Sequence, residues 1–200
     1  MKRILFATSN ESKALRFKKG LLEKEIEIIT INDLDRKIEV IEDGETAIQN
    51  ALIKARNYAR EVDIPVFAMD DNLYIENIPD DKQPGMCVRR VNGKRLNDLE
   101  MIEYYSNLVH TYSPDGKLSC KWVYGLAVIN DEKEATYSFS KGDFYLVDKA
   151  TTKINPGYPL NSISIDKKLN KYFTDISKED MESIKEDESG VIDFIASNVK

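Results

Sequence analysis

The sequence predicts an α/β protein with a mixed β-sheet, in two lobes with a cleft between them. Short apolar runs alternate with helical patterns in the first half of the chain, as in strands joined by crossover helices. Residues 118–149 instead hold runs rich in Val, Tyr, Phe and Thr, separated by turn residues, which indicates an antiparallel meander. The 200 residues are enough for one domain with a real hydrophobic core.

The first half of the chain predicts alternating strands and helices. Residues 4–7 and 26–31 are apolar or β-branched and read as strands, with a helical pattern over 11–22 between them. Apolar residues recur at three- and four-residue steps over 45–62, which predicts a second helix. Residues 66–69 read as a buried strand that ends before residues 70–72, and 73–78 are a candidate for a further strand.

The second half predicts a different set of elements. Two prolines and two glycines make residues 79–95 a long loop, and a helical pattern covers 96–112. Residues 130–132 and 141–143 are expected to separate three strands of the meander. A helix is expected from Lys178, with Ser177 as its N-cap.

Composition and charge exclude several classes of protein. A net charge of −6 without a basic stripe is a poor match to a nucleic-acid backbone, so no nucleic-acid partner is expected. No stretch approaches the roughly 20 apolar residues of a membrane span, and the first apolar run is too short for a signal peptide. Cys87 and Cys120 fit neither a disulfide framework nor a zinc site. A cytoplasmic protein with reduced thiols is therefore expected.

The first candidate for a chemical role is the turn from the first strand into the first helix. Free N–H groups at a helix start attract anions, and Thr8, Ser9 and Asn10 stand at this turn. Lys13, one helical turn on, could reach back to a phosphate. A capped helix with a solvated lysine explains the same residues.

The second candidate is a set of carboxylates, Glu42, Asp70 and Asp71. The aspartates follow a buried strand, and the carboxyl end of a strand faces the ligand crevice in open α/β sheets. Mg²⁺ usually takes one or two carboxylates together with substrate phosphates, and a carboxylate can also orient or deprotonate water. An ordinary turn at residues 70–72 is the alternative.

Polar and cationic residues elsewhere could either contact a ligand or lie on an ordinary solvated surface. The helix over 45–62 carries Gln49, Asn50, Lys54 and Arg56, which mostly read as a solvated face, although Lys54 is next to the apolar stripe and could line a cleft. Arg90 and its neighbour Arg89 follow a Pro-Gly turn and could contact phosphate or form ion pairs with an acidic surface. His110, the only histidine, has no Ser or Cys partner nearby in sequence and is read as structural.

Taken in order, four segments resemble the inosine triphosphate pyrophosphatase family, also called Ham1-like or non-canonical purine NTP pyrophosphatases. Residues 7–13 (ATSNESK) are similar to that family's A-T-x-N-x-x-K opening. Residues 42–44 and 46–55 (EDG, TAIQNALIKA) resemble E-x-G and T-F-x-E-N-A-x-x-K-A. Residues 64–73 (IPVFAMDDNL) and 84–90 (PGMCVRR) resemble L-P-x-x-A-D-D-S-G-L and P-G-x-x-S-A-R.

The resemblance implies a fold, a reaction and an assembly. The implied fold is one ITPase-like domain over residues 1–200, with an elongated mixed sheet flanked by helices and two lobes around a central cleft. The implied reaction is Mg²⁺-dependent hydrolysis of a nucleoside triphosphate, such as ITP, XTP or dITP, to the monophosphate and pyrophosphate. The implied assembly is a homodimer.

The resemblance also assigns roles residue by residue. Asp70 would be the catalytic carboxylate and, with Glu42, would hold the metal. Lys13 would act in catalysis and bind the triphosphate, and Lys54 would neutralise its charge. The full set of expected substrate-binding residues is Thr8, Ser9, Asn10, Lys13, Lys54, Asp71, Arg90 and Tyr158.

Four departures from the family pattern concern activity and base selectivity. Met69 stands at the first acidic position of the strand motif, and Gln49 replaces a helix glutamate. The loop at 155–159 lacks the family's aspartate, and acidic residues at 184–188 stand where the family has S-H-R. A catalytically weak or inactive nucleotide-binding regulatory module on the same fold is the alternative function.

Overall fold

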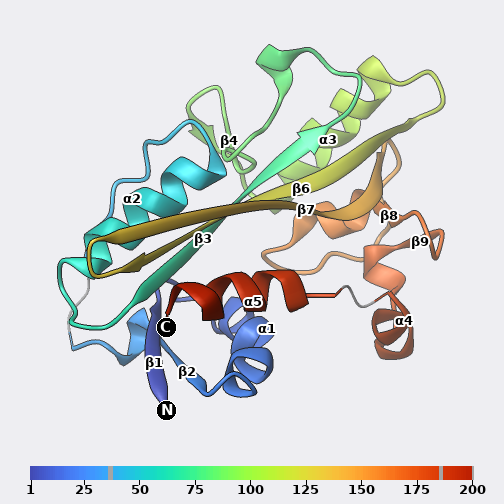
Figure 1. Cartoon of the computed structure of the whole chain (residues 1–200). Coiled ribbons are helices and arrows are strands. Elements are labelled where there is room, and N and C mark those ends of the chain that lie inside the picture. Colours follow the sequence, from blue (N-terminus) through green and yellow to red (C-terminus); the bar gives the residue numbers. More distant parts are fainter. Residues whose placement is uncertain (36–37, 185–186, 200) are drawn as a thin grey trace. The chain divides into compact units, whose positions relative to one another are not determined.

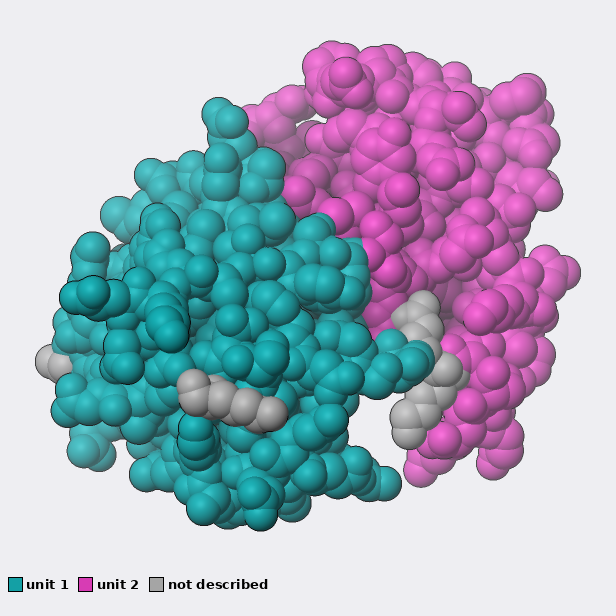
Figure 2. Space-filling view, viewed as in Figure 1, with its two compact units in different colours: residues 1–71, 124–139, 187–200 teal, residues 72–123, 140–186 magenta. Residues whose placement is uncertain are grey.

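The computed structural model describes residues 1–35, 38–184 and 187–199. The chain forms two compact units, which are coloured separately in Figure 2. Unit 1 comprises Met1–Asp71, Tyr124–Phe139 and Asp187–Lys200, and unit 2 comprises Asn72–Val123 and Ser140–Glu186.

Seven strands form one mixed sheet in the order β2-β1-β3-β6-β7-β8-β9. β1 pairs in parallel with β2 and β3, whereas β8 pairs antiparallel with β7 and β9, which confirms the predicted α/β fold with a mixed sheet. A separate hairpin joins two short strands, β4 and β5. The strands are β1 (Lys2–Phe6), β2 (Ile26–Thr30), β3 (Val66–Ile75), β4 (Arg90–Val91), β5 (Lys94–Arg95), β6 (Lys117–Asn130), β7 (Lys133–Val147), β8 (Ser164–Asp166) and β9 (Lys171–Tyr172).

Helices flank the strands, and Figure 1 labels and colours them in the order in which they occur along the chain. In the described ranges no helix is both long enough and apolar enough to cross a membrane. The α-helices are α1 (Glu11–Leu22), α2 (Ala47–Ala59), α3 (Asp98–Tyr112), α4 (Lys178–Ser183) and α5 (Ser189–Asn198). The 3-10 helices are η1 (Ile31–Asp33), η2 (Asp80–Lys82), η3 (Pro159–Ile163) and η4 (Phe173–Asp175).

The sheet of unit 1 buries both of its faces. Side chains alternate between the two faces along each strand, so Phe6 and Phe67 stack at 4.1 Å on the side covered by α1 and α5. Leu5 and Ala68 pack against α2 on the opposite side. Strands buried on both faces read as continuous apolar runs, which is why the sequence revealed β1 and the start of β3.

Helix α2 begins at a capping box and lies close to the sheet. The Thr46 hydroxyl accepts a hydrogen bond from the Gln49 N–H at 3.2 Å, and Gln49 Oε1 accepts from the Thr46 N–H at 3.1 Å. A Cβ on Gly125 of β6 would lie 2.2 Å from the Ile48 nitrogen. The first turn of α2 is therefore packed directly on the strand, where a glycine leaves room for it.

Strand β3 is longer than the sequence predicted, and the alternative of an ordinary turn at Asp70, Asp71 and Asn72 is wrong. These residues lie inside one strand that runs from Val66 to Ile75. The strand continues past the end of β1 because it also pairs with β6, its other neighbour in the sheet, and forms a bridge to a later segment. The Leu73 N–H donates to the Gly85 carbonyl at 2.9 Å. Tertiary pairing here overrides the weak strand propensity of Asp and Asn.

Three further predictions are corrected in the second half of the chain. The meander has two long strands, β6 and β7, because residues 141–143 stay in β7 with Gly142 at a φ of +74°. Residues 79–95 include the β4–β5 hairpin, with Asn92 and Gly93 at positive φ in its turn. The Ser177 cap is confirmed, but α4 ends at Ser183 and α5 is a second helix.

The core of unit 2 lies between α3 and one face of its strands. Tyr105 is fully buried there with Leu118, Phe144 and Leu146. Its hydroxyl donates to the Val88 carbonyl at 2.8 Å, so this buried polar group is satisfied.

Candidate active site

The turn between β1 and α1 is tightly built. The Thr8 hydroxyl accepts a hydrogen bond from the Asn10 N–H at 3.1 Å, and Asn10 Oδ1 caps the helix by accepting from the Lys13 N–H at 3.3 Å. Asn10 therefore serves the helix as its N-cap. Ser9 is exposed, and its carbonyl accepts from the Asn32 amide at 3.2 Å.

The two adjacent aspartates of β3 point to opposite faces of the sheet. Asp71 follows Phe67 and Met69 in the alternation, so it faces α1, where Lys13 Nζ donates to its Oδ1 at 3.0 Å. Asp70 follows Val66 and Ala68, so it faces α2. The Asp71 backbone N–H also donates to Asp70 Oδ1 at 2.9 Å, which holds the Asp70 carboxylate against the backbone of β3.

On the α2 side, the structure brings Asp70 together with Glu42 and Lys54. Lys54 Nζ forms an ion pair with Glu42 Oε2 at 2.8 Å, and the lysine side chain is only 16% exposed. Burial raises the pKa of Asp70 above its ordinary value, and the nearby Glu42 charge adds to this, while Lys54 and the Asp71 N–H oppose it. Two carboxylates and one ammonium thus share a partly desolvated region.

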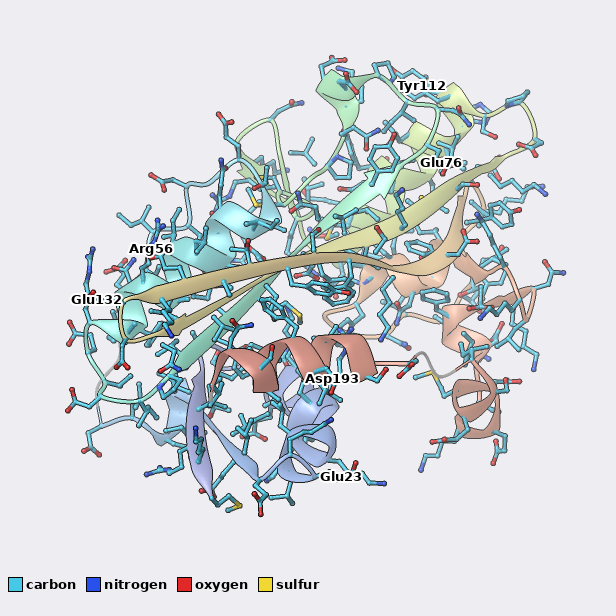
Figure 3. The ribbon with its side chains drawn as sticks, in the orientation of Figure 1. Glu23, Arg56, Glu76, Tyr112, Glu132 and Asp193 are labelled. Carbon is cyan, nitrogen blue, oxygen red and sulfur yellow. The ribbon has the colours of Figure 1, made fainter. Side chains whose placement is uncertain are left out.

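Asn50 belongs to the same group, although the sequence placed it on a solvated face. Asn50 is 3% exposed; its Oδ1 accepts from the Gly44 N–H at 2.7 Å, and its side chain hydrogen-bonds Asp70. The signal was its spacing of four residues from Lys54, which puts both on one helix face. The expected solvated position is confirmed for Arg56, which is labelled in Figure 3. Arg56 pairs with Glu134 at 2.6 Å, and the two side chains are 48% and 41% exposed.

A cavity of about 260 Å³ opens beside this group within unit 1. Its polar lining includes Thr8, Ser9, Glu42 and Lys54. Burial, followed by the Glu42 charge, raises the pKa of the Tyr58 hydroxyl at its wall. The full lining is Ala7, Thr8, Ser9, Ile31, Ile38, Val40, Glu42, Lys54 and Tyr58.

Lys13 and Asp71 lie outside that lining, so the predicted residues form two groups. The two groups lie on opposite faces of β3, at the adjacent residues Asp70 and Asp71. β1 pairs with β3 only as far as Phe67, and residues 69–71 extend beyond its carboxyl end. A ligand at the carboxyl end of β1 would therefore meet the Thr8 turn and this edge of β3, from which both faces are within reach.

Two predicted substrate-binding residues, Arg90 and Tyr158, belong to unit 2. Arg90 lies in β4 and is exposed, and Tyr158 is 60% exposed before η3. The neighbouring Arg89 forms an ordinary ion pair, with Nη1 donating to Asp98 Oδ1 at 2.7 Å. The Gly157 N–H, together with Arg89, lowers the pKa of Asp98. Substrate roles for Arg90 and Tyr158 stay predictions.

The donor chemistry around Asp70 suits a hard divalent cation. In the described parts of the chain no cluster of three or more His, Cys, Asp or Glu side chains could enclose a metal. Glu42 and Asp70 supply two carboxylates, and Mg²⁺ typically binds through one or two carboxylates with substrate phosphates and water. A pair of this kind fits a metal that completes its coordination shell with water and with phosphate oxygens of a substrate.

Two departures from the family pattern now have a local explanation. Gln49 completes the capping box, a task that Gln and Glu share. Met69 is 3% exposed and packs in the core beneath α1. In the acidic stretch at 184–188, Lys185 and Glu186 lie outside the described residues. Glu188 forms a two-pronged ion pair with Arg16 of α1, with Nε to Oε1 at 2.5 Å and Nη2 to Oε2 at 3.2 Å.

Comparison with known proteins identifies relatives of this chain. A model of the Ham1 family matches residues 4–186. A dITP/XTP pyrophosphatase from Wigglesworthia glossinidia brevipalpis is 31% identical over 182 residues, which cover 90% of this chain and 88% of that protein. A protein of the same name from Oceanobacillus iheyensis is 31% identical over 169 residues, covering 84% and 83%.

Solved structures show the same fold. The Ham1 protein of Staphylococcus aureus superposes with a TM-score of 0.74 at 22% identity, over 98% of this chain and 97% of that one. A HAM1 protein from Coxiella burnetii gives the same TM-score and identity over 98% of both chains.

Proposed function

The chain belongs to the Ham1 family, and from this we propose that it is a nucleoside-triphosphate pyrophosphatase. Its substrates are non-canonical purine nucleoside triphosphates of the dITP and XTP class, because the relatives that match most of the chain carry that name. The reaction adds one water to the triphosphate and releases the nucleoside monophosphate and pyrophosphate.

The grouping of Glu42, Lys54 and Asp70 beside the Thr8 turn carries this proposal. Lys54 and Glu42 line the same cavity as Thr8 and Ser9, and Asp70 responds electrostatically to both. Phosphate ligands need cations and N–H donors, whereas a metal needs carboxylates. Both kinds of group meet beside one turn, although they come from segments far apart in the sequence.

The residues divide the work of phosphoryl transfer between positioning and charge. Lys54 and Lys13 each hold a carboxylate partner at 2.8 and 3.0 Å and can turn their ammonium groups to phosphate oxygens. The Thr8 turn presents its hydroxyl and the start of α1 to the same oxygens. Asp70, partly shielded from solvent, accepts the proton of the attacking water or orients it toward the α-phosphorus.

We propose Mg²⁺ as the cofactor, with Glu42 and Asp70 as its protein ligands. When bound, this ion neutralises phosphate charge and polarises the phosphorus–oxygen bonds. Glu42 is the freer of the two carboxylates, since its side chain is 37% exposed. When Glu42 binds the metal, the ammonium group of its ion-pair partner Lys54 can turn to a phosphate of the substrate.

We further propose a cytoplasmic homodimer, as the family resemblance implies. Both cysteines are free thiols, which suits a reducing compartment. Light scattering after size-exclusion chromatography tests the dimer, for which the chain mass of 22.9 kDa sets the reference. A mass of one chain at micromolar concentration would refute it.

A substrate panel tests the enzyme. Purified protein with Mg²⁺ is offered ITP, XTP, dITP and the four common NTPs, and pyrophosphate and monophosphate are quantified. We expect release from the non-canonical purines first, and none from the Asp70→Asn variant. Release of orthophosphate instead of pyrophosphate would contradict cleavage between the α- and β-phosphates.

The alternative function, a nucleotide-binding module without turnover, has one observation in its favour. Met69 fills the first acidic position of the strand motif and is buried in the core, so no carboxylate is present there. Ligand binding to the native state raises its melting temperature. A nucleotide-dependent rise in melting temperature without any product in the panel would favour this module over the enzyme.

A further inference from the structure

Asn50 is a buried amide with both of its polar ends in use. It lies in the first turn of α2 and is 3% exposed. Buried polar side chains are normally hydrogen-bonded, and an amide can accept at its oxygen while donating at its nitrogen. The two partners of Asn50 lie on two different segments of the candidate site.

The first partner is the segment that carries Glu42. The Gly44 N–H donates to Asn50 Oδ1 at 2.7 Å. A Cβ on Gly44 would lie 2.6 Å from that oxygen and 2.7 Å from the Cβ of Gln49, so the segment approaches α2 as closely as a glycine permits. Glu42 is only two residues away, and its position follows from this contact.

The second partner is the Asp70 carboxylate. Because Gly44 occupies the amide oxygen, the Asn50 nitrogen is the donor toward Asp70, and an ionised carboxylate only accepts. The alternation along β3 directs Asp70 to the face that α2 covers. One rigid amide thus connects the Glu42 segment to the Asp70 strand.

Asn50 is not needed to cap the helix that carries it. Thr46 and Gln49 already form the capping box of α2, in which each side chain accepts from the other's N–H. Lys54, one turn further on, forms an ion pair with Glu42 and acts on Asp70 through its charge. Asn50 instead hydrogen-bonds both carboxylate segments, which is a directional connection between them.

We propose that Asn50 is a positioning residue that sets the separation of Glu42 and Asp70 before a divalent cation binds. This inference rests on the metal site of the proposed function. Residues that orient metal ligands without touching the metal typically contribute about 10- to 100-fold to metal affinity.

The test measures the affinity of the full chain for Mn²⁺ alone, by electron paramagnetic resonance of the free ion. Asn50→Ala should weaken Mn²⁺ binding by about tenfold or more. Asn57→Ala is the matched control, because Asn57 lies on the same helix and donates to the Ile53 carbonyl at 2.7 Å. It should leave Mn²⁺ affinity within about twofold. Equal affinities of wild type and Asn50→Ala would overturn the proposal.

A second variant separates positioning from general damage. Gly44→Ala should also weaken Mn²⁺ binding, because its methyl group displaces the Asn50 oxygen. In the double variant the two losses should overlap rather than add, since both break one connection. Full additivity would overturn the proposal. If Asn50→Ala fails to fold, the Gly44→Ala variant decides alone. An Mn²⁺ affinity of Gly44→Ala equal to that of the wild type would then overturn the proposal.

The outcomes also distinguish this inference from the proposed function. A wild type that binds Mn²⁺, loses it in Asn50→Ala and releases no pyrophosphate supports the positioning role and refutes the enzyme. A wild type that hydrolyses dITP while Asn50→Ala keeps full Mn²⁺ affinity supports the enzyme and refutes the positioning role. A wild type that binds no Mn²⁺ refutes the positioning role.

Discussion

Lys13 and Asp71 are 58 residues apart in sequence, and the structure joins them by an ion pair of 3.0 Å. Each side chain is about one-third exposed, at 32% and 29%, so solvent screens the pair. An ammonium held by a screened carboxylate is positioned but easily released. Lys13 is thus preset near the edge of β3, where the proposed phosphate site begins.

Replacing Lys13 tests that role. Lys13→Met should raise KM for the nucleotide by about tenfold or more, since a charge-assisted bond to phosphate contributes about 1.5–3 kcal/mol. The free energy of unfolding should change by less than about 1 kcal/mol, because exposed pairs contribute little. Steady-state kinetics and urea unfolding measure the two quantities. Lys24→Met, which breaks the exposed Lys24–Asp193 pair, is the control and should alter neither.

Lys54 should have two separable effects. In Lys54→Met, kcat/KM should fall by about 100-fold because a largely covered phosphate-neutralising charge is lost. Affinity for Mn²⁺ alone should rise, since the ammonium no longer competes for Glu42. Arg56→Met removes a cation from the exposed side of the same helix, and it should change neither kcat/KM nor the affinity for Mn²⁺. Weaker Mn²⁺ binding in Lys54→Met would count against the competition.

Asp70 should affect stability in a pH-dependent way. Burial raises the pKa of Asp70 in the native state, so the native state holds the proton to higher pH than the unfolded state does. Ionised Asp70 therefore costs stability once the pH exceeds the unfolded pKa of about 3.9. The stability of Asp70→Asn relative to wild type should rise with pH from there and level off above the native pKa.

Urea unfolding from about pH 2 to pH 8 measures this difference, and Asp98, whose change falls in the acid part of that range, is the control with the opposite sign. The Gly157 N–H and Arg89 lower the pKa of Asp98, so its ionised form stabilises the native state. Asp98→Asn should lose stability relative to wild type as the pH rises through the depressed native pKa toward the unfolded value. A pH-independent difference for Asp70→Asn would rule out the burial effect.

The Arg16–Glu188 pair should matter for stability more than the exposed pairs. Both side chains are largely covered, at 21% and 17% exposed, and the guanidinium carbon lies 5.1 Å from the ring centroids of Phe17 and Tyr124. Arg16→Met leaves a covered carboxylate without this partner and should destabilise by about 3 kcal/mol. The double variant Arg16→Met/Glu188→Met should recover part of that loss in urea unfolding. No recovery would mean that the loss comes from packing on the rings.

Local patterns predicted most of unit 1 and failed where partners are distant. Helices α1 and α2 were predictable because cap residues and apolar spacing are local signals. The continuation of β3 through Asp70 was not, since it depends on Gly85 and later residues taking over its pairing. For the same reason Asn50 looked like a surface residue, because its partner Asp70 lies on a strand whose place beside α2 is set by tertiary packing.

The continuity of β3 makes its register a strict requirement. Val66 and Phe67 are paired with Leu5 and Phe6, and this fixes which side each later residue takes. Sliding the strand by one residue would put Asp71 in the place of Asp70 and Asp70 in the place of Met69, inside the core around Phe6. Insertions and deletions among relatives should consequently fall before Pro65 or after Ile75. An alignment that places a gap between those positions to restore a second acidic residue at Met69 would put a carboxylate in the core beneath α1.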